Sequence, residues 1–353
     1  MFPASFNIQL SSALLDWLWR SWISFGVSGH GPQARPDHVI DPEALVLASS
    51  QWARYDARLF DEMLDWLCLH GHLIHLQRLR NLQRAGLGDP RVLSAIAAVL
   101  VERASHSKWK ALVSKPPLSQ SLTPLFLNLG EQTPVWGAPD PIFAAQGFHR
   151  GRLELRQLSQ PPDPDRAANF WLKLRSLFGA SARAEILLQL LLTGPSTAAD
   201  IARQSGFSAR SVLLPLREMA LSGHLHEPPR PLRNRPQRGQ AIAARTRGPS
   251  LAYALRPEEW SFLRTWGEPA GFPKLESPLP LLLLCQNALA LFPASPVQSA
   301  GLQSLQLREA VAAPLLEIQR LGLSGNYGLA PDLSGDRLAA TLAERLPALI
   351  SSL

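Results

Sequence analysis

Cysteine and lysine are scarce in this chain. Cys68 and Cys285 are isolated from each other among 353 residues, which gives no disulfide framework and is typical of a protein in the reducing cytoplasm. Lysine occurs five times against thirty arginines, a bias that genome composition alone can produce. The number of arginines is therefore discounted, and we interpret only their distribution relative to acidic residues.

Long apolar runs are absent as well. The longest, Leu279–Cys285, is too short to span a bilayer and is followed by Gln286 and Asn287. The N-terminus has no leading basic segment, and Asp16 and Arg20 interrupt its apolar stretch, so no signal peptide is predicted. We expect a cytoplasmic protein with no membrane partner.

The common catalytic motifs are also missing. The chain contains no phosphate-cradling G-x-x-x-x-G-K-[ST], no H-E-x-x-H, no G-x-S-x-G and no C-x-x-C. Gly86-Leu87-Gly88 is followed by Asp89-Pro90 rather than by a further glycine of a dinucleotide-binding loop. Dispersed catalytic residues can escape such a search. We predict a protein that is not an enzyme, with no catalytic residues and no cofactor.

One cluster contains possible zinc ligands, namely Cys68, His70, His72 and His75. Its spacing matches no closed zinc pattern, and positions 68, 70 and 72 point in different directions on a helix. We therefore interpret the cluster as a helix end with polar residues and predict no metal site.

Four acids lie close together between residues 56 and 65, namely Asp56, Asp61, Glu62 and Asp65. Asp56 is expected to cap a helix that contains the other three. Paired carboxylates can act in general acid–base catalysis. The interpretation adopted is the simpler one, in which these acids form the solvated face of the helix.

The composition predicts a folded, mainly α-helical protein of two or three domains. A hydrophobic content of 46% is ample for buried cores, and apolar residues recur mostly at helical spacing. The net charge of +7 and a pI near 10 suit a polyanionic partner. Strand patterns are scarce outside one central segment.

Four segments are expected along the chain. Residues 1–105 read as an α-helical bundle that begins with a tryptophan-rich helix, and Asp41-Pro42-Glu43 has the pattern of a helix start. Residues 106–164 form a proline-rich extended connector. Residues 165–266 form the central module, and 267–353 form a C-terminal α-helical domain, in which Pro314 and Pro347 should kink or end helices.

The central module contains three predicted helices. The first is Ala182–Thr193, ended by Gly194-Pro195. The second runs through Gln204, capped by Ser196 or Thr197, and Gly206 supplies the turn that follows. The third is capped by Ser208 and ends near Ser222-Gly223. Pro215 should kink or shorten it.

Two short strands are predicted next, in the segments HLHEP and LAYAL. The loop between them, Pro228–Gly248, contains no acid and six arginines: Arg230, Arg233, Arg235, Arg238, Arg245 and Arg247. Guanidinium groups on such a loop can hold phosphates or enter a minor groove. An ordinary solvated loop is the alternative.

The module reads LKLRSLFGASARAEILLQLLLTG, then STAADIARQSGFSARSVLLPLREMALSGHL. It resembles the winged-helix domains of arsenical-repressor-like and multiple-antibiotic-resistance-like bacterial regulators, over about residues 171–255. The resemblance implies a winged helix-turn-helix with a small β-hairpin wing. It also implies that Ser208, Arg210, Ser211 and Arg217 approach bases in the major groove, while the six loop arginines hold the backbone.

The predicted function is binding of double-stranded DNA by a bacterial transcriptional regulator, with a homodimer as one possible assembly. Winged helices also dock proteins, so the alternative is an interaction adaptor or scaffold with a protein partner. In that alternative, the adaptor could belong to a phage-defence or toxin–antitoxin-type system.

Overall fold

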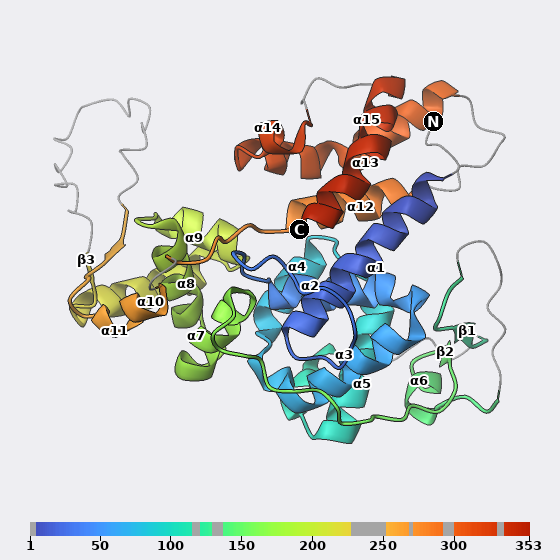
Figure 1. Ribbon diagram of the computed structural model, residues 1–353, viewed down its shortest axis with the longest axis horizontal. Helices are drawn as coiled ribbons and strands as arrows, with labels where there is room; N and C mark the ends of the chain where they lie inside the picture. The colour runs from blue at the N-terminus through green and yellow to red at the C-terminus, as the bar shows by residue number, and fades with distance from the viewer. Residues whose placement is uncertain are drawn as a thin grey trace, which may run out of the picture. The chain divides into compact units, whose positions relative to one another are not determined.

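The computed structural model describes residues 5–114, 121–128, 137–226, 252–267, 271–291, 300–329 and 335–353, and it is mainly helical, which confirms the predicted class (Figure 1). The chain divides into two compact units. Unit 1 combines residues 1–172 with residues 276–353, and unit 2 is the continuous segment 173–275. No helix among the described residues is both long enough and apolar enough to cross a membrane.

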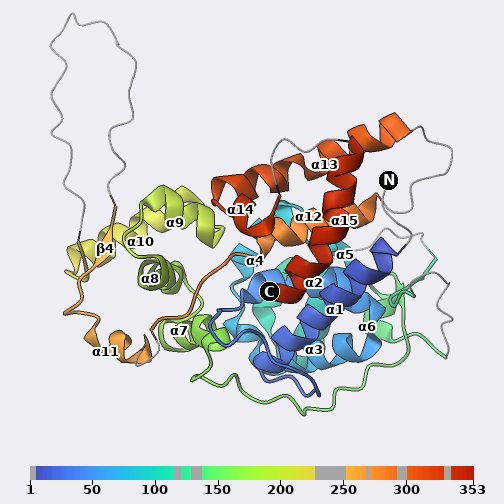
Figure 2. The ribbon, with the colours of Figure 1, turned by 45° about the horizontal axis from the view of Figure 1, so that its top comes forward.

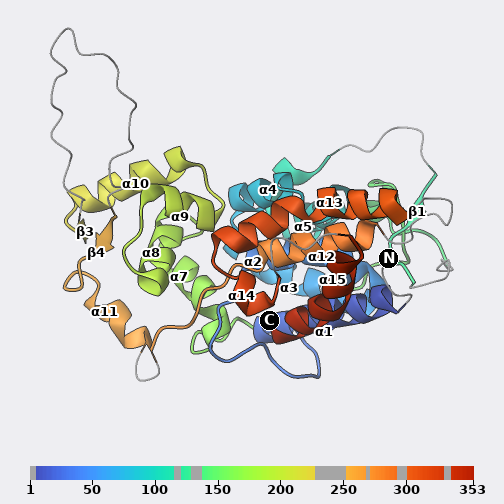
Figure 3. The same ribbon diagram turned by 90° about the horizontal axis from the view of Figure 1, so that it is seen from above.

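Unit 1 is a helical assembly built from both ends of the chain. Its helices are α1 (Phe6–Ser24), α2 (Pro42–Trp52), α3 (Ala57–His70), α4 (Leu76–Arg84), α5 (Pro90–Ala104), α6 (Pro141–Ala144), α12 (Leu279–Ala290), α13 (Ala300–Arg320), α14 (Ser324–Tyr327) and α15 (Gly335–Ser352). Helix α15 packs along α1, and α12 packs against α13 (Figures 1 and 3). One core of buried apolar side chains joins helices of both chain segments. The C-terminal segment, expected as a separate domain, therefore lies in the same unit as the N-terminal helices.

Aspartates begin several of these helices. Asp41 accepts a hydrogen bond from the backbone N–H of Ala44 at 3.0 Å, and Asp56 accepts one from that of Leu59 at 3.0 Å. Pro42 occupies the first turn of α2, where its missing N–H costs no helical hydrogen bond. The predicted starts at Asp41 and Asp56 are confirmed. Pro314 and Pro347 lie inside continuous helices and end neither α13 nor α15.

The connector is folded onto unit 1. It contains a 3-10 helix (Ser107–Leu112), the two-residue strands β1 (Thr123–Pro124) and β2 (Phe148–His149), which pair in parallel, and helix α6. Asp140 accepts hydrogen bonds from the N–H groups of Ile142 at 3.0 Å and Leu153 at 3.0 Å, so one buried carboxylate ties α6 to the segment that follows β2.

The acids of α3 hold this connector, so their interpretation as a solvated face is wrong. Glu62 and Asp65 are 3% and 2% exposed. Asp65 accepts hydrogen bonds from the N–H groups of Gln157 at 2.7 Å and Ser159 at 3.1 Å, and Glu62 pairs with Arg156. Asp65 thus supplies an acceptor to the buried N–H of Ser159, and Glu62 is buried against the half-exposed side chain of Arg156.

Arg150 of the connector is also buried. Its guanidinium forms two hydrogen bonds to the carboxylate of Asp61, at 2.5 and 3.0 Å, and lies 5.1 Å from the ring centre of Phe143. Arg150 and Arg156 therefore attach the connector to α3.

Replacing Asp65 with alanine should release the segment around residues 157–159, because the buried N–H of Ser159 loses its acceptor at a cost of about 1–3 kcal/mol and the part-buried N–H of Gln157 loses its acceptor as well. Hydrogen exchange of peptides from residues 150–164 measures the effect. Asp16→Ala, at an exposed carboxylate of α1, is the control and should leave exchange unchanged. Equal protection in both variants would contradict the role assigned to Asp65.

The largest buried ionic cluster described in unit 1 is centred on Arg78 of α4, which is 1% exposed. Its guanidinium donates to both carboxylate oxygens of Asp41, each at 2.6 Å, and to Glu43 at 2.7 Å. The same group lies 4.6 Å from the ring centre of Trp171. Glu43 also accepts from the backbone N–H of His75 at 2.7 Å, so the cluster joins α2 to the start of α4.

Unit 2 contains five helices among its described residues. They are the second part of α7 (Phe170–Phe178), then α8 (Ala182–Thr193), α9 (Ala198–Ser205), α10 (Ala209–Leu221) and α11 (Ser261–Arg264). Strand β3 (Leu225–His226) pairs antiparallel with β4 (Ala254–Leu255) (Figures 2 and 3). Ser196 forms an isolated antiparallel bridge to Tyr253.

The local sequence explains the helix ends of unit 2. The bounds of α8 are those predicted, and Thr197 caps α9 by accepting from the N–H of Asp200 at 3.1 Å. Gly206 adopts the left-handed conformation, with φ of 70°, and allows the turn into α10. Pro215 lies inside α10 without interrupting its thirteen residues.

Candidate nucleic-acid interface

Helix α10 carries the four residues predicted to approach bases. Ser208 caps the helix and accepts from the N–H of Ser211 at 3.1 Å, so these two hydroxyl groups lie at its first turn. Arg210 and Arg217 are exposed. The opposite side of the helix is buried in the unit through Val212, Leu216 and Met219.

The two arginines of α10 retain their positive charge toward solvent. Within the part of the chain that the structure describes, neither Arg210 nor Arg217 forms an ion pair. The neighbouring acid, Glu218, is bound instead by Arg183 of α8 at 2.5 Å. The carboxylate next to Arg217 in the sequence is thus paired with another arginine.

The same exposed surface of α10 carries two leucines. Leu214 is 61% exposed and Leu221 is 91% exposed. Each is one or two helical turns from Arg210 or Arg217, so the surface is mixed rather than purely basic. An apolar side chain there can contact a thymine methyl group or a protein partner.

The six loop arginines, Arg230, Arg233, Arg235, Arg238, Arg245 and Arg247, lie outside the described residues. The strands that frame the loop are described, with Leu225 opposite Leu255 and His226 opposite Ala254. This pairing brings His226 and Ala254, which flank the arginine-rich segment in the sequence, opposite each other after α10.

A buried ion pair fixes α8 against α7. Arg175 donates from Nε and Nη2 to Oε1 of Glu185, at 3.0 and 2.7 Å, and the two side chains are 0% and 2% exposed. At the other end of the unit, the indole N–H of Trp260 donates to the backbone oxygen of His224 at 2.9 Å. These contacts hold the helix that supports α10 and the turn that follows α10.

Charge is distributed unequally between the two units. Unit 2 contains fifteen lysines and arginines against seven acids, a net charge of +8, whereas the whole chain carries +7. Unit 1, with twenty basic and twenty-one acidic residues, therefore has a net charge of −1. The surplus positive charge is thus a property of the inserted unit and not of a uniform arginine bias.

One of the possible zinc ligands, His75, has another role. His75 caps α4 by accepting from the N–H of Arg78 at 3.2 Å. Burial raises the pKa of the Cys68 thiol to about 12, with a smaller contribution from Asp65, and so disfavours the thiolate that binds metals. Burial, followed by the nearby His72, lowers the pKa of His70. Among the described residues, no three His, Cys, Asp or Glu side chains form a group that could hold a metal ion.

Comparison of the chain with protein-family models, curated proteins and solved structures found no match in any of the three.

Proposed function

We propose that unit 2 is a winged helix-turn-helix module that binds double-stranded DNA, as in a transcriptional regulator. The order of α8, the Ser196 bridge, α9, α10, β3 and β4 agrees with such a module. In this proposal α10 approaches base edges through Ser208, Arg210, Ser211 and Arg217, and the six loop arginines contact phosphates.

The observation that carries the proposal is the separation of charge. A net +8 within one 103-residue unit, beside a near-neutral remainder, is what a polyanionic partner requires. A general bias toward arginine would enrich both units in arginine. It would not by itself give one unit many more basic than acidic residues.

Salt dependence of binding tests the proposal on the full chain. Replacing Arg230, Arg233, Arg235 and Arg238 with alanine should flatten the plot of log affinity against log salt concentration by about 3–4 units, because about four phosphate contacts are lost. The measurement is a titration of labelled duplex DNA at several salt concentrations.

A matched control removes the same charge from unit 1. Arg84, Arg103, Arg308 and Arg337 are exposed and form no ion pair within the described chain, and their replacement with alanine should leave the slope unchanged. Equal slopes for the wild type and the loop variant would exclude the loop from the interface. An equal decrease of the salt slope in both variants would mean that binding depends only on the total charge of the chain.

The exposed leucines of α10 favour a second candidate, in which the module docks a protein. Leu214 and Leu221 present apolar surface on the helix predicted to meet DNA. Affinity capture with and without nuclease separates the two functions, since a directly bound protein remains after digestion and a protein held through DNA does not.

A further inference from the structure

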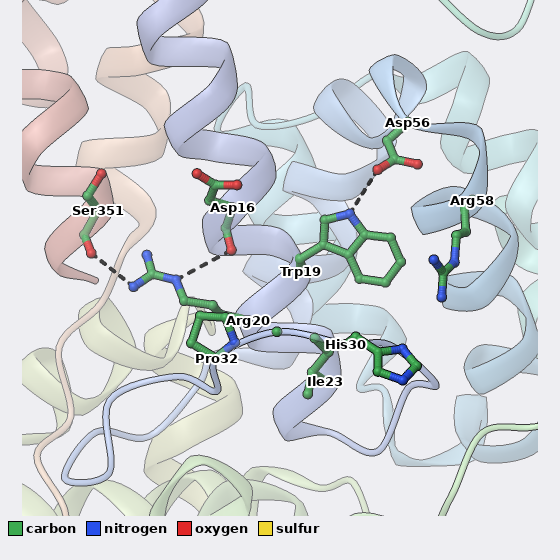
Figure 4. Close-up of a pocket in the computed structure, with 10 residues that line it drawn as sticks. Asp16, Trp19, Arg20, Ile23, His30, Pro32, Asp56, Arg58 and Ser351 are labelled. Carbon is green, nitrogen blue, oxygen red and sulfur yellow. Dashed lines mark hydrogen bonds between the residues drawn. The ribbon is translucent and has the colours of Figure 1, made fainter.

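An open cleft in unit 1 lies on α1 and includes none of the residues assigned above to the nucleic-acid interface. Its volume is about 630 Å³, within the range of small-molecule sites. It is lined by α1, the loop that follows α1, the start of α3 and the end of α15 (Figure 4). Trp19 lies between the guanidinium groups of Arg20 and Arg58 in this view.

The two arginines of the cleft have no carboxylate partner within the described chain. Arg20 donates to the backbone oxygens of Asp16 at 3.4 Å and Ser351 at 3.0 Å, which orient the side chain without neutralising it. The Arg58 guanidinium lies 5.6 Å from the Trp19 ring centre and has no ion pair. Both groups therefore retain donors for an anion.

The acids in the cleft do not neutralise these cations. Asp56 uses one carboxylate oxygen to accept from the N–H of Leu59 at 3.0 Å and the other to accept from the Trp19 indole N–H at 2.8 Å. The Asp16 carboxylate points away from the Arg20 guanidinium in Figure 4 and forms no ion pair among the described residues.

An apolar surface lies between the two cations. Trp19 and Ile23 project from α1, and Pro32 and the exposed His30 come from the loop opposite them. The loop approaches α1 closely at Gly29, where an added Cβ would be 3.0 Å from Cζ3 of Trp19. The indole is also held by its hydrogen bond to Asp56, so this surface is rigid and suited to a flat ligand.

We propose that this cleft binds a small planar molecule that carries a carboxylate. The carboxylate is held by Arg58 at one edge of the Trp19 ring, and the planar part lies against Trp19, Ile23 and Pro32, toward Arg20. Arg–carboxylate hydrogen bonds fix the orientation of the ligand, while the apolar contact supplies area.

Calorimetric titration of the full chain with 2-naphthoate tests the proposal. We expect saturable binding, and at least about tenfold weaker binding of the neutral 2-naphthamide and of acetate, which lacks the ring. Arg58→Gln should weaken 2-naphthoate binding by about tenfold or more, and Arg20→Gln, on the other side of the Trp19 ring, should weaken it less. Arg308→Gln, at an exposed arginine of α13 outside the cleft, should have no effect.

The indole N–H signal of Trp19 gives the location of binding. It is identified by its loss in Trp19→Phe and should shift on titration with 2-naphthoate. The proposal is overturned if the amide binds as tightly as the acid, if Arg58→Gln behaves like Arg308→Gln, or if no binding is detected up to about 10 mM. DNA binding by unit 2 is not measured in this experiment, so the two proposals fail independently.

Discussion

Replacing Arg78 with methionine is expected to lower the free energy of unfolding of unit 1 by about 3–5 kcal/mol, because it leaves the buried charges of Asp41 and Glu43 without their cation. It also removes the guanidinium group from the face of Trp171. Chemical denaturation monitored by hydrogen exchange of peptides from α2 and α4 measures the loss of unfolding free energy in unit 1.

The control for this variant is Arg84→Met, on the same helix but at an exposed position, which should change the free energy of unfolding little. A variant that also carries Asp41→Asn and Glu43→Gln should recover part of the lost stability, since neutral side chains cost less to bury. Similar stabilities of Arg78→Met and Arg84→Met would show that the cluster contributes no net stabilisation.

Replacing Glu185 with leucine should destabilise unit 2 by about 3–5 kcal/mol, because the fully buried Arg175 loses the acceptor of two hydrogen bonds. Exchange of α8 amides should accelerate strongly, and those of unit 1 should keep their protection. Any DNA affinity of the chain should fall with the population of folded unit 2, since α8 supports α10.

The exposed ion pair between Arg183 and Glu218 supplies the comparison. Its side chains are 57% and 46% exposed, so Glu218→Leu should change stability by at most about 1 kcal/mol. If Glu185→Leu lowered the stability of unit 2 no more than Glu218→Leu does, the buried ion pair of Glu185 would contribute no more than the exposed one.

Local chemistry predicted much of the helical structure. Ser208 and Asp56 cap helices where their sequence neighbours indicate, and Gly194 ends α8 as predicted. These features depend on hydrogen bonds and backbone angles within a few residues of each other. The mainly α class follows for the same reason and is confirmed.

Long-range partners could not be predicted in this way. The periodicity of α3 places Asp65 on a helix face, but its partners are backbone groups more than ninety positions later. Arg78 similarly resembles any arginine of a polar helix face until Asp41 and Glu43 are placed beside it. The position of Asp65 among the apolar residues Leu64, Trp66 and Leu67 is one weak sequence signal that its carboxylate is buried.

The candidate DNA interface was predicted in part from spacing and in part from resemblance. The exposure of Arg210 and Arg217 agrees with the predicted interface, since Val212 and Leu216 take the buried side of α10. DNA binding itself stays a prediction, as do the roles of the six loop arginines. The cleft beside Trp19 had no sequence signal, because its lining comes from segments more than three hundred residues apart.

The assembly of unit 1 from two separate stretches has a consequence for synthesis on the ribosome. Translation completes residues 173–275 before it supplies α15, so the inserted unit can fold while α1 still lacks the helix that packs along it. Until then the nascent chain exposes apolar side chains such as Leu10 and Leu14, which makes incomplete products targets for chaperones and proteases. Folding of unit 1 therefore depends on the synthesis of α15, whereas folding of unit 2 does not.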